Sequence, residues 1–339
     1  MDAGSGGSLS KILITGGAGY IGSTIASACA DRGITPVIVD NLVTGRREFV
    51  RDHAFFEGDI CDGVLLDKVF AEHPDIFAVV HCAALIVVPD SVTDPIGYYH
   101  ANVTKSLEMV RHLVRNGCTR LLFSSSAAIY SPGEDLSVGE ESPIGPASPY
   151  ARTKAVCEQM FADIAAAAPL RVLSLRYFNP IGADPMLRTG LQVREPTHVV
   201  GRLVLSALTG VPFRITGTDY PTRDGTGIRD YLHVWDLAEA HLAALESFDR
   251  VLTGRTSRAV NLGTGHGTTV RELLDAFNSV SDTPVTAVEA PRRPGDQVGA
   301  FARCELAASL LGWRARFSIE DGIADALRWA RVRDQILRD

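Results

Sequence analysis

The sequence has few cysteines, no long apolar run and no excess of basic residues, and each shortage excludes a class of protein. Its six cysteines form neither a CxxC pair nor a Cys/His ligand cluster, so neither a structural zinc site nor a disulfide framework is indicated. The longest apolar run, residues 76–88, is too short to span a bilayer. The Gly/Ser-rich first ten residues contain no apolar run, which argues against a signal peptide. Together these features predict a protein of the reducing cytoplasm with no metal and no membrane partner.

The balance of charges also limits the partners. With 33 Lys and Arg residues against 40 Asp and Glu residues, the net charge is −7. A nucleic-acid partner needs a basic face on the protein, so none is expected. A small anionic ligand is compatible with this charge, because a local cluster of arginines can oppose the overall sign. The apolar share of 46% is enough for a large buried core.

The first half of the chain alternates short β-branched runs with helical patterns. Apolar strands separated by helices indicate a parallel sheet covered on both faces. After Asn179 the pattern changes to Gly/Pro-rich segments with fewer strands, as in a lobe that gathers a substrate. We therefore predict an α/β protein with a Rossmann-type doubly wound parallel sheet at residues 9–178. Residues 179–339 are expected to form a smaller C-terminal α/β lobe, with some segments returning to the first domain. The expected strands are 12–15, 36–40, 55–57, 78–82, 120–125 and 171–177, and the expected helices are 20–32, 62–72, 95–115 and 149–167.

A glycine-rich turn follows the first expected strand. Gly16 permits a tight turn, Gly19 lets backbone N–H groups approach a pyrophosphate, and Gly22 allows the helix to pack closely on the strand. The positive end of the helix dipole at this point favours an anionic ligand. Asp40 ends the second strand about 20 residues further on, where a carboxylate binds the adenosine ribose of a dinucleotide. The pattern predicts a dinucleotide site.

The acidic residues near this turn favour NAD over NADP. The carboxylate of Asp40 would repel a 2′-phosphate, whereas the neighbouring Arg46 and Arg47 could accept one. Since Asp40 comes first in the expected geometry, NAD is the predicted cofactor. Asp59 follows the third strand and could reach the adenine amino group; it could also be an ordinary turn residue.

Two further segments carry candidate catalytic residues. Ser126 lies in a serine cluster directly after a strand, and Tyr150 and Lys154 lie four residues apart at the start of a helix, on one face. A phenol ionises near pH 10, and acting as a base near neutrality requires about 4 kcal/mol of stabilisation of the phenolate. The Lys154 ammonium and a positively charged nicotinamide ring are natural sources of that stabilisation. Ser126 could bond to the same substrate hydroxyl and relay its proton.

These residues, in this order and spacing, resemble the UDP-glucose 4-epimerases, which are extended short-chain dehydrogenases. The resemblance runs over nearly the whole chain, and residues 217–231 are its most specific stretch. It implies NAD-dependent inversion of carbon 4 in a UDP-hexose, with Tyr150 as the acid/base, Ser126 in its hydrogen-bond path and a 4-keto sugar between the two hydride transfers. The matching segments are 16–22, 40–42, 58–60, 124–126, 150–154, 176–180, 217–231, 261–265 and 291–296.

The resemblance also implies the ligand contacts and a homodimer. The pairing helices would be those near 95–115 and 149–167. The expected NAD contacts, besides Tyr150 and Lys154, are Gly16, Gly19, Tyr20, Ile21, Gly22, Asp40, Asn41, Asp59, Ile60, Cys82, Ala83, Ala84, Asn102, Ser124 and Phe178. The expected nucleotide-sugar contacts, besides Ser126 and Tyr150, are Phe178, Asn179, His198, Val199, Arg214, Thr216, Arg229, Arg293, Asp296 and Ala300.

Several positions depart from the family pattern and leave the substrate open. Ile86 replaces a lysine that contacts the cofactor, and His198 replaces an asparagine at the diphosphate. Arg214 and Thr216 are atypical where the base is read, which weakens the assignment of uracil without excluding it. Ala300 replaces a tyrosine that in some members restricts the sugar pocket, so a 2-acetamido sugar such as UDP-GlcNAc becomes an expected substrate.

Three alternatives remain at this point. Arg188 and Arg194 could meet the carboxylate of a UDP-uronic acid, and a dTDP-sugar is a further option for a biosynthetic epimerase. A nucleotide-sugar dehydratase would need an acid pair directly after Ser126, where this chain has Ala127 and Ala128. A redox-sensing regulator that binds NAD without chemistry would be expected to lack the tyrosine or the lysine.

Overall fold

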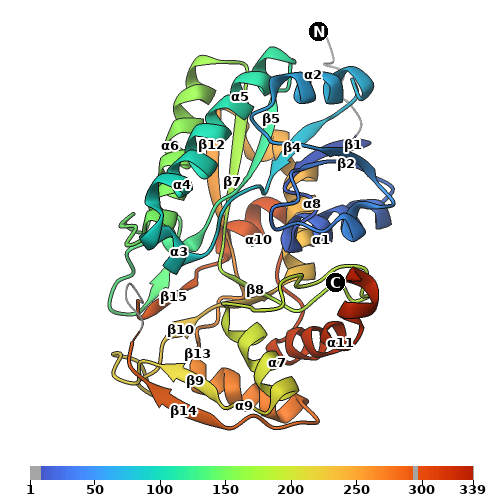
Figure 1. Cartoon of the computed structure of the whole chain (residues 1–339). Helices are drawn as coiled ribbons and strands as arrows, with labels where there is room; N and C mark the ends of the chain where they lie inside the picture. The colour runs from blue at the N-terminus through green and yellow to red at the C-terminus, as the bar shows by residue number, and fades with distance from the viewer. Residues whose placement is uncertain (1–8, 293–296, 339) are drawn as a thin grey trace.

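A central sheet of seven parallel strands organises the computed structural model, which describes residues 9–292 and 297–338 (Figure 1). The strand order is β12-β7-β5-β4-β1-β2-β3, and every neighbouring pair is parallel. This order reverses direction at β1, which makes the sheet doubly wound and confirms the predicted Rossmann-type fold. The strands are β1 (Lys11–Thr15), β2 (Thr35–Asp40), β3 (Ala54–Glu57), β4 (Ala78–His81), β5 (Arg120–Ser124), β7 (Arg171–Tyr177) and β12 (Ser257–Leu262).

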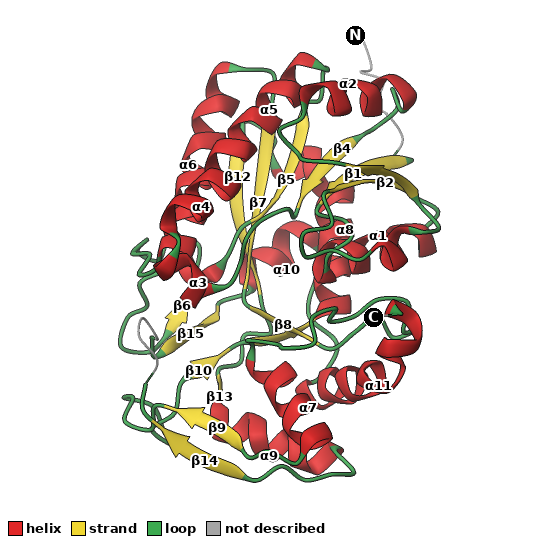
Figure 2. Cartoon of the chain, in the orientation of Figure 1, coloured by secondary structure: helices red, strands yellow, loops and turns green. Residues whose placement is uncertain are grey.

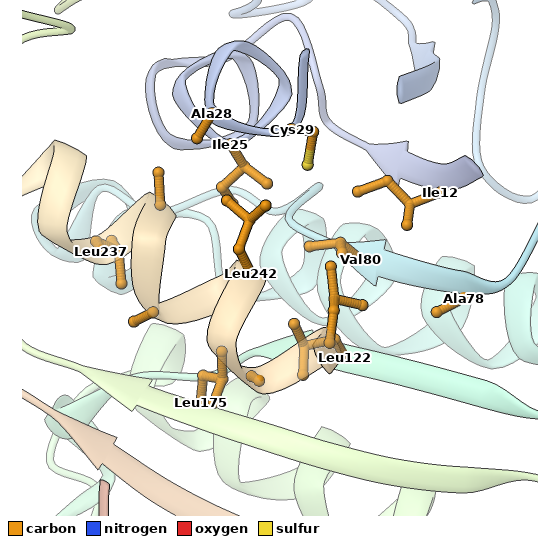
Figure 3. Packing of buried hydrophobic residues seen from close by; sticks show 14 of the residues in the cluster. Ile12, Ile25, Ala28, Cys29, Ala78, Val80, Leu122, Leu175, Leu237 and Leu242 are labelled. Atoms are coloured by element: carbon orange, nitrogen blue, oxygen red, sulfur yellow. The ribbon is translucent and has the colours of Figure 1, made fainter. Parts of the chain in front are cut away.

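Helices cover both faces of this sheet (Figure 2). Because side chains alternate along a strand, Ile12 and Ile14 point to one face and Leu13 to the other, and all three are fully buried. The first face packs against α1 (Tyr20–Asp31), α8 (Val234–Val251) and α10 (Glu305–Leu311), as Figure 3 shows for part of the cluster. The second face packs against α2 (Gly63–Glu72), α5 (Lys105–Arg115) and α6 (Pro149–Ala167).

The segment expected as one helix at 95–115 is helical throughout but contains a π turn. It begins at α4 (Pro95–Tyr99), where Asp94 accepts a hydrogen bond from the Gly97 N–H at 2.9 Å, and passes through η2 (His100–Thr104) into α5. A short helix that the sequence did not predict, α3 (Val88–Thr93), precedes it. The π turn carries Asn102, and such turns often mark functional sites.

The C-terminal lobe contains more strands than expected, but most are only two to four residues long. The small strands form a four-stranded sheet in the order β13-β10-β15-β6 and the pairs β8–β11 and β9–β14. They are β6 (Ser137–Val138), β8 (Asn179–Ile181), β9 (Phe213–Thr216), β10 (Ile228–Arg229), β11 (Tyr231–His233), β13 (Thr268–Thr269), β14 (Ala287–Ala290) and β15 (Gly299–Ala302). The first region of the chain contributes β6 to the four-stranded sheet, and it also contains two 3₁₀ turns, η1 (Arg47–Val50) and η3 (Ala127–Ile129). The lobe's helices are α7 (Val199–Thr209), α9 (Val270–Val280) and α11 (Ile319–Leu337).

The two lobes are joined by chain crossings and by one buried carboxylate. Residues 257–262 return to the large sheet as β12, so the chain enters the first domain again after building part of the second. Asp230, fully buried between β10 and β11, accepts hydrogen bonds from the backbone of Thr264, Gly265 and Ala302 at 2.8, 3.0 and 3.1 Å. It thereby ties the loop after β12 to β15. No helix within the described residues is long and apolar enough to cross a membrane.

Candidate active site

The carboxyl ends of four adjacent strands bring the predicted motifs together. Strands β5, β4, β1 and β2 are neighbours in the sheet, and they lead into Ser124–Ser126, Cys82, Gly16 and Asp40 respectively. Ligands of open α/β sheets bind at this edge, where the strand order reverses. The smaller lobe lies beyond the same edge (Figure 1).

The glycine turn is built too tightly for side chains. Gly16 has a φ of +73°, and a Cβ there would lie 2.6 Å from the Ala83 nitrogen; a Cβ at Gly22 would lie 2.3 Å from the Gly16 carbonyl oxygen. Helix α1 begins at Tyr20 after the N-cap residue Gly19, with no side-chain cap among the described residues and no acidic residue in its first turn. Its first N–H groups and its dipole therefore suit a phosphate, and the cradle fits the pyrophosphate of NAD.

Tyr20 and Ile21 form the first turn of that helix. The hydroxyl of Tyr20 donates to the Gly182 carbonyl at 2.7 Å and so links the cofactor turn to the segment after β8. Burial raises the pKa of Tyr20 well above its ordinary value, so its phenol stays neutral. Tyr20 can therefore contact a pyrophosphate without repelling it.

Asp40 is held by backbone donors at the end of β2. Its carboxylate accepts hydrogen bonds from the N–H groups of Ala18 at 2.9 Å and Leu42 at 2.8 Å. Burial raises the pKa of Asp40, and these two donors oppose that rise. Each carboxylate oxygen has a further lone pair for a ribose hydroxyl. The residue thus fits the predicted role of a ribose acceptor.

Asp59 has a partner that the sequence did not reveal. Lys105 on α5 forms an ion pair with its carboxylate, and the amide of Asn41 donates to it at 3.4 Å. Burial alone would raise the pKa of Asp59, but Lys105 and the Cys61 backbone hold it below its ordinary value. Ile60 next to it is buried in the core. Asn41, Asp59 and Ile60 therefore lie together beyond β2 and β3, as an adenine site requires.

Asn102 braces the loop after β4 from its π turn. Its side-chain oxygen accepts from the Leu85 N–H at 2.8 Å, and its amide donates to the Leu85 carbonyl at 2.9 Å and to the Thr153 hydroxyl at 3.0 Å. The loop so held contains the expected cofactor positions Cys82, Ala83 and Ala84. Ile86 in the same loop is 61% exposed. Asn102 thus shapes the cofactor loop through backbone contacts.

The three predicted catalytic side chains lie side by side. Helix α6 begins with Pro149 after Ser148, whose hydroxyl accepts from the Ala151 N–H at 3.2 Å, and this start places Tyr150 and Lys154 on one face. The Ser126 hydroxyl lies close enough to Tyr150 to lower the pKa of its phenol. The Lys154 ammonium donates to the Ser124 carbonyl at 2.7 Å. The structure therefore assembles the Ser126–Tyr150–Lys154 constellation at the sheet edge.

The electrostatics of Tyr150 differ from the expectation that Lys154 lowers its pKa. Burial raises the pKa of Tyr150, and only the hydrogen bond with Ser126 opposes that rise. Burial likewise lowers the pKa of Lys154. The ammonium is directed to a backbone carbonyl, so the protein alone does not stabilise the phenolate. The positive nicotinamide ring is the other source of charge that the sequence led us to expect.

The expected sugar contacts gather where β8, β10 and β15 meet. Phe178 and Ala300 pack in one apolar cluster with Tyr130, and Asn179 opens β8. Ala300 pairs in register with Arg229. The Arg229 guanidinium donates to the backbone carbonyls of Ile228, Val298 and Gln297 at 2.7, 2.8 and 3.1 Å, which fixes its position. The predicted contacts Arg293 and Asp296 lie outside the described residues.

His198 caps a helix, which changes the role expected for it. Its Nδ1 accepts from the Gly201 N–H at 3.3 Å at the start of α7, where Val199 is the first helical residue. Burial lowers the pKa of His198 to about 4, so the ring is neutral and its Nε2 carries the proton. Nε2 is buried with no hydrogen-bond partner among the described residues. It borders a mainly apolar cavity of about 210 Å³ between α7 and α11.

The residues expected to contact the nucleotide base or a sugar carboxylate lie apart from Phe178 and Ala300. Arg214 and Thr216 lie on β9, which pairs with β14 at the far end of the small lobe. Arg188 forms ion pairs with Asp31 and Asp184, so its charge is already engaged by carboxylates of the protein. Sequence reasoning missed the buried Asp230 and Glu158, although both lie inside or beside the motifs that it used.

Comparison with known proteins agrees with this geometry. Residues 12–263 match the NAD dependent epimerase/dehydratase family. The UDP-glucose 4-epimerase of Azospirillum brasilense is 43% identical, over 96% of this chain and 93% of its own. Among solved structures, the Stenotrophomonas maltophila UDP-glucose-4-epimerase with bound NAD and formylated UDP-arabinopyranose has a TM-score of 0.91 and 37% identity, covering 96% of this chain and 99% of that one. The Brucella ovis UDP-glucose 4-epimerase in complex with NAD has a TM-score of 0.88 and 38% identity, covering 94% and 98%. The chain therefore belongs to the NAD dependent epimerase/dehydratase family, and within it to the UDP-glucose 4-epimerases.

Proposed function

We propose that this chain inverts carbon 4 of UDP-hexoses, with UDP-glucose/UDP-galactose and UDP-GlcNAc/UDP-GalNAc as its substrates. The observation that carries the proposal is the buried Ser126–Tyr150–Lys154 constellation beside a glycine cradle that fits NAD. A dehydratase is disfavoured because Ala127 and Ala128, which follow Ser126 in η3, cannot transfer protons.

The residues of the site divide the chemistry between them. NAD, when bound, supplies the acceptor for the hydride of carbon 4 and later its donor. The Tyr150 oxygen takes the proton of the 4-hydroxyl while Ser126 holds that oxygen by a hydrogen bond. Lys154, one helical turn from Tyr150, is anchored on the Ser124 carbonyl. When the 4-ketone is reduced from its other face, Tyr150 returns the proton, so the enzyme ends as it began.

The two regions of the chain divide the ligands. We assign NAD to residues 9–178, through the expected contacts around Gly16, Asp40, Asp59 and the loop after β4. We assign the nucleotide sugar mainly to residues 179–339, through Asn179, Val199, Arg229 and their neighbours, while β12 and α8 return to the first domain.

The small side chain of Ala300 is the basis for assigning 2-acetamido sugars as substrates. Ala300 packs against the apolar cluster that contains Phe178 and Tyr130, and it pairs in register with Arg229 on the neighbouring strand. A tyrosine there would occupy the space next to the sugar, whereas a methyl group leaves room for an acetamido substituent.

Product analysis tests the reaction and the sugar together. The NAD-loaded protein is incubated with UDP-glucose, UDP-GlcNAc and dTDP-glucose, and the epimers are separated and identified. We expect turnover of both UDP-sugars and a loss of about 10²- to 10⁴-fold for Tyr150→Phe. Ala300→Tyr should reduce turnover of UDP-GlcNAc at least about tenfold more than that of UDP-glucose. Turnover of none of these sugars would refute the function, and an equal effect of Ala300→Tyr on both UDP-sugars would refute the sugar assignment.

We also propose that the enzyme is a homodimer of the cytoplasm. Five exposed apolar side chains support the dimer, since they lie on the neighbouring helices α3 to α6: Val92, Ile96, Tyr99, Leu107 and Val156. A shallow depression lined by Pro95, Ile96, Tyr99, His100 and Thr104 occupies the same surface. The six free cysteines agree with a reducing compartment.

A further inference from the structure

Three residues of α6, each four positions from the next, face three consecutive serines at the end of β5. The Ser126 hydroxyl is close enough to Tyr150 to lower the pKa of its phenol, and the Lys154 ammonium donates to the Ser124 carbonyl at 2.7 Å. The third of these residues, Glu158, accepts a short hydrogen bond from the Ser125 hydroxyl. Because residues four apart share a helix face, Tyr150, Lys154 and Glu158 all face the end of β5.

Glu158 is held in turn by a buried arginine on the next strand. Arg176 of β7 donates to its carboxylate through Nε at 3.0 Å and Nη2 at 2.6 Å, and the two side chains are only 11% and 12% exposed. The remaining Arg176 nitrogen donates to the Tyr130 hydroxyl at 2.8 Å, and Tyr130 donates to Asn261 at 2.7 Å. The network therefore joins α6, the β5 end, β7 and β12.

This arrangement serves geometry more than stability. Desolvating a carboxylate and a guanidinium costs much of what their attraction returns, so a buried ion pair is a weak source of stability. A bidentate pair does fix orientation strongly. Arg176 holds the Glu158 carboxylate in place, and this carboxylate in turn accepts a hydrogen bond from the Ser125 hydroxyl. Ser125 is the residue directly before Ser126 in the chain.

We propose that Glu158 is a positioning residue of the epimerase: through Ser125 it holds the Ser126 hydroxyl in line with the Tyr150 oxygen. The inference rests on the proposed function. If the anchor is removed, the strand end can shift against α6, and a displacement of about 1 Å at reacting groups can cost about 100-fold in rate.

A pH profile separates this role from simple stabilisation. The hydrogen bond of Ser126 lowers the pKa of Tyr150, so weakening it moves the rising limb of the kcat profile to higher pH. Other titratable groups near Tyr150 are Lys154 on its own helix, Tyr98 on α4 and Tyr177 on β7. Burial raises the pKa of Tyr98 to about 12 and that of Tyr177 well above its ordinary value, so neither ionises in the working range.

Four titratable groups lie around Glu158. They are Arg176 and Tyr130, from the elements packed against α6, and Cys157 and Lys154 on α6 itself. Burial raises the pKa of Cys157 to about 11 and that of Tyr130 to about 12, and the Glu158 carboxylate raises the pKa of Arg176 above its ordinary value, against the effect of burial. Burial lowers the pKa of Lys154, but deprotonation of this ammonium removes a positive charge and gives a falling limb, so a shift of the rising limb reports on Tyr150.

The experiment compares Ser125→Ala, Glu158→Ala and Glu158→Gln as NAD-loaded enzymes, with kcat and KM for UDP-glucose measured across pH. Ser125→Ala removes one hydrogen bond and leaves the Glu158–Arg176 ion pair intact, so it tests the positioning role even if Glu158→Ala fails to fold. We expect Ser125→Ala and Glu158→Ala to lower kcat at neutral pH by about tenfold or more, with unchanged KM and the limb shifted to higher pH. Glu158→Gln keeps an oxygen that accepts from Ser125, so its limb should lie closer to wild type.

Gln159→Ala is the matched control. Gln159 is exposed on the same helix, donates to Asp163 at 2.8 Å, and should leave both kcat and the limb unchanged. An active wild type together with a Ser125→Ala enzyme of wild-type kcat and limb would overturn the positioning role alone. A wild type inactive on every sugar would overturn the proposed function, and this inference with it.

Discussion

Burial and ionisation oppose each other at Tyr150. The side chain lies on the buried face of α6, and this environment raises the pKa of its phenol, while the hydrogen bond with Ser126 lowers it. A base that works near neutrality needs the opposite net direction. The nearest fixed cation, Lys154, donates to a carbonyl, and its own charged form is disfavoured by burial. The protein therefore holds the phenol neutral until a cationic ligand arrives.

The charge of the nicotinamide should consequently decide when Tyr150 ionises. We expect its phenol to ionise at lower pH in protein loaded with NAD⁺ than in protein loaded with NADH, which lacks the positive ring. With NADH the ionisation should stay above about pH 10, the ordinary value for a phenol. The measurement is the ultraviolet absorbance of phenolate during a pH titration, taken as the difference between wild type and Tyr150→Phe in each loaded state. Equal midpoints with the two cofactors would show that the protein itself sets the pKa.

Single residues were predictable from the sequence where their chemistry is local. Tyr150 and Lys154 are four apart in one helix, and Asp40 ends its strand at the distance that a ribose site requires, so spacing indicated them once it was combined with the glycine turn and the serine cluster. Glu158 and Asp230 were missed because their partners come from distant segments: Arg176 lies 18 residues away from Glu158, and Ala302 lies 72 residues away from Asp230. His198 was found, but its helix-capping role depends on where α7 begins.

At the scale of elements, strand prediction succeeded where short β-branched and apolar runs alternate with helical patterns. The six strands predicted in the first half correspond to β1 to β5 and β7. Two strands of the small lobe, β10 and β13, are only two residues long and have no period to detect. The π turn at Asn102 was hidden for another reason, because the helical pattern continues on both sides of it.

The contact between α1 and the glycine turn can be tested by one methyl group. Gly22→Ala places a Cβ 2.3 Å from the Gly16 carbonyl oxygen and 2.9 Å from the Gly17 Cα, so the helix must move away from the turn. Although alanine favours a helix by about 1 kcal/mol, we expect a net loss of about 1–3 kcal/mol of unfolding free energy from overpacking. The loss should be accompanied by weaker retention of NAD, and both are measured by chemical denaturation and by assay of bound cofactor.

Gly33→Ala is the control for this change. Gly33 has a φ of +72° in the turn after α1, and a Cβ there meets nothing within 4 Å. It should cost about 1–2 kcal/mol from the left-handed backbone alone and leave NAD retention unchanged. If Gly33→Ala releases NAD as readily as Gly22→Ala does, the cradle does not depend on close packing of α1.

At the scale of the whole molecule, the site lies between two lobes that cannot separate freely. Asp230 ties the loop after β12 to β15, and Tyr20 links the cofactor turn to the segment after β8. The surface formed by α3 to α6 lies on the other side of the large sheet from α1, α8 and α10 (Figure 1). Helix α6 therefore carries the catalytic tyrosine on its buried face and Val156 on its exposed face. A partner seated on that surface would stiffen the catalytic helix from outside.

The dimer proposed for this surface should depend on Ile96. Its side chain is 83% exposed on α4, and burying an isoleucine is worth about 1.5–3 kcal/mol. A two-fold interface buries it twice, so Ile96→Glu should weaken association by about 3–6 kcal/mol and give monomers in sedimentation velocity. Val64→Glu is the matched control, since Val64 is 82% exposed on α2, away from α4, and should leave the dimer intact. A wild type that sediments as a monomer would refute the dimer, and an Ile96→Glu protein that sediments as a dimer would place the partner surface elsewhere. If the dimer does form here, Ile96→Glu should also lower kcat more than KM, because α4 packs against α6 and steadies the helix that holds Tyr150.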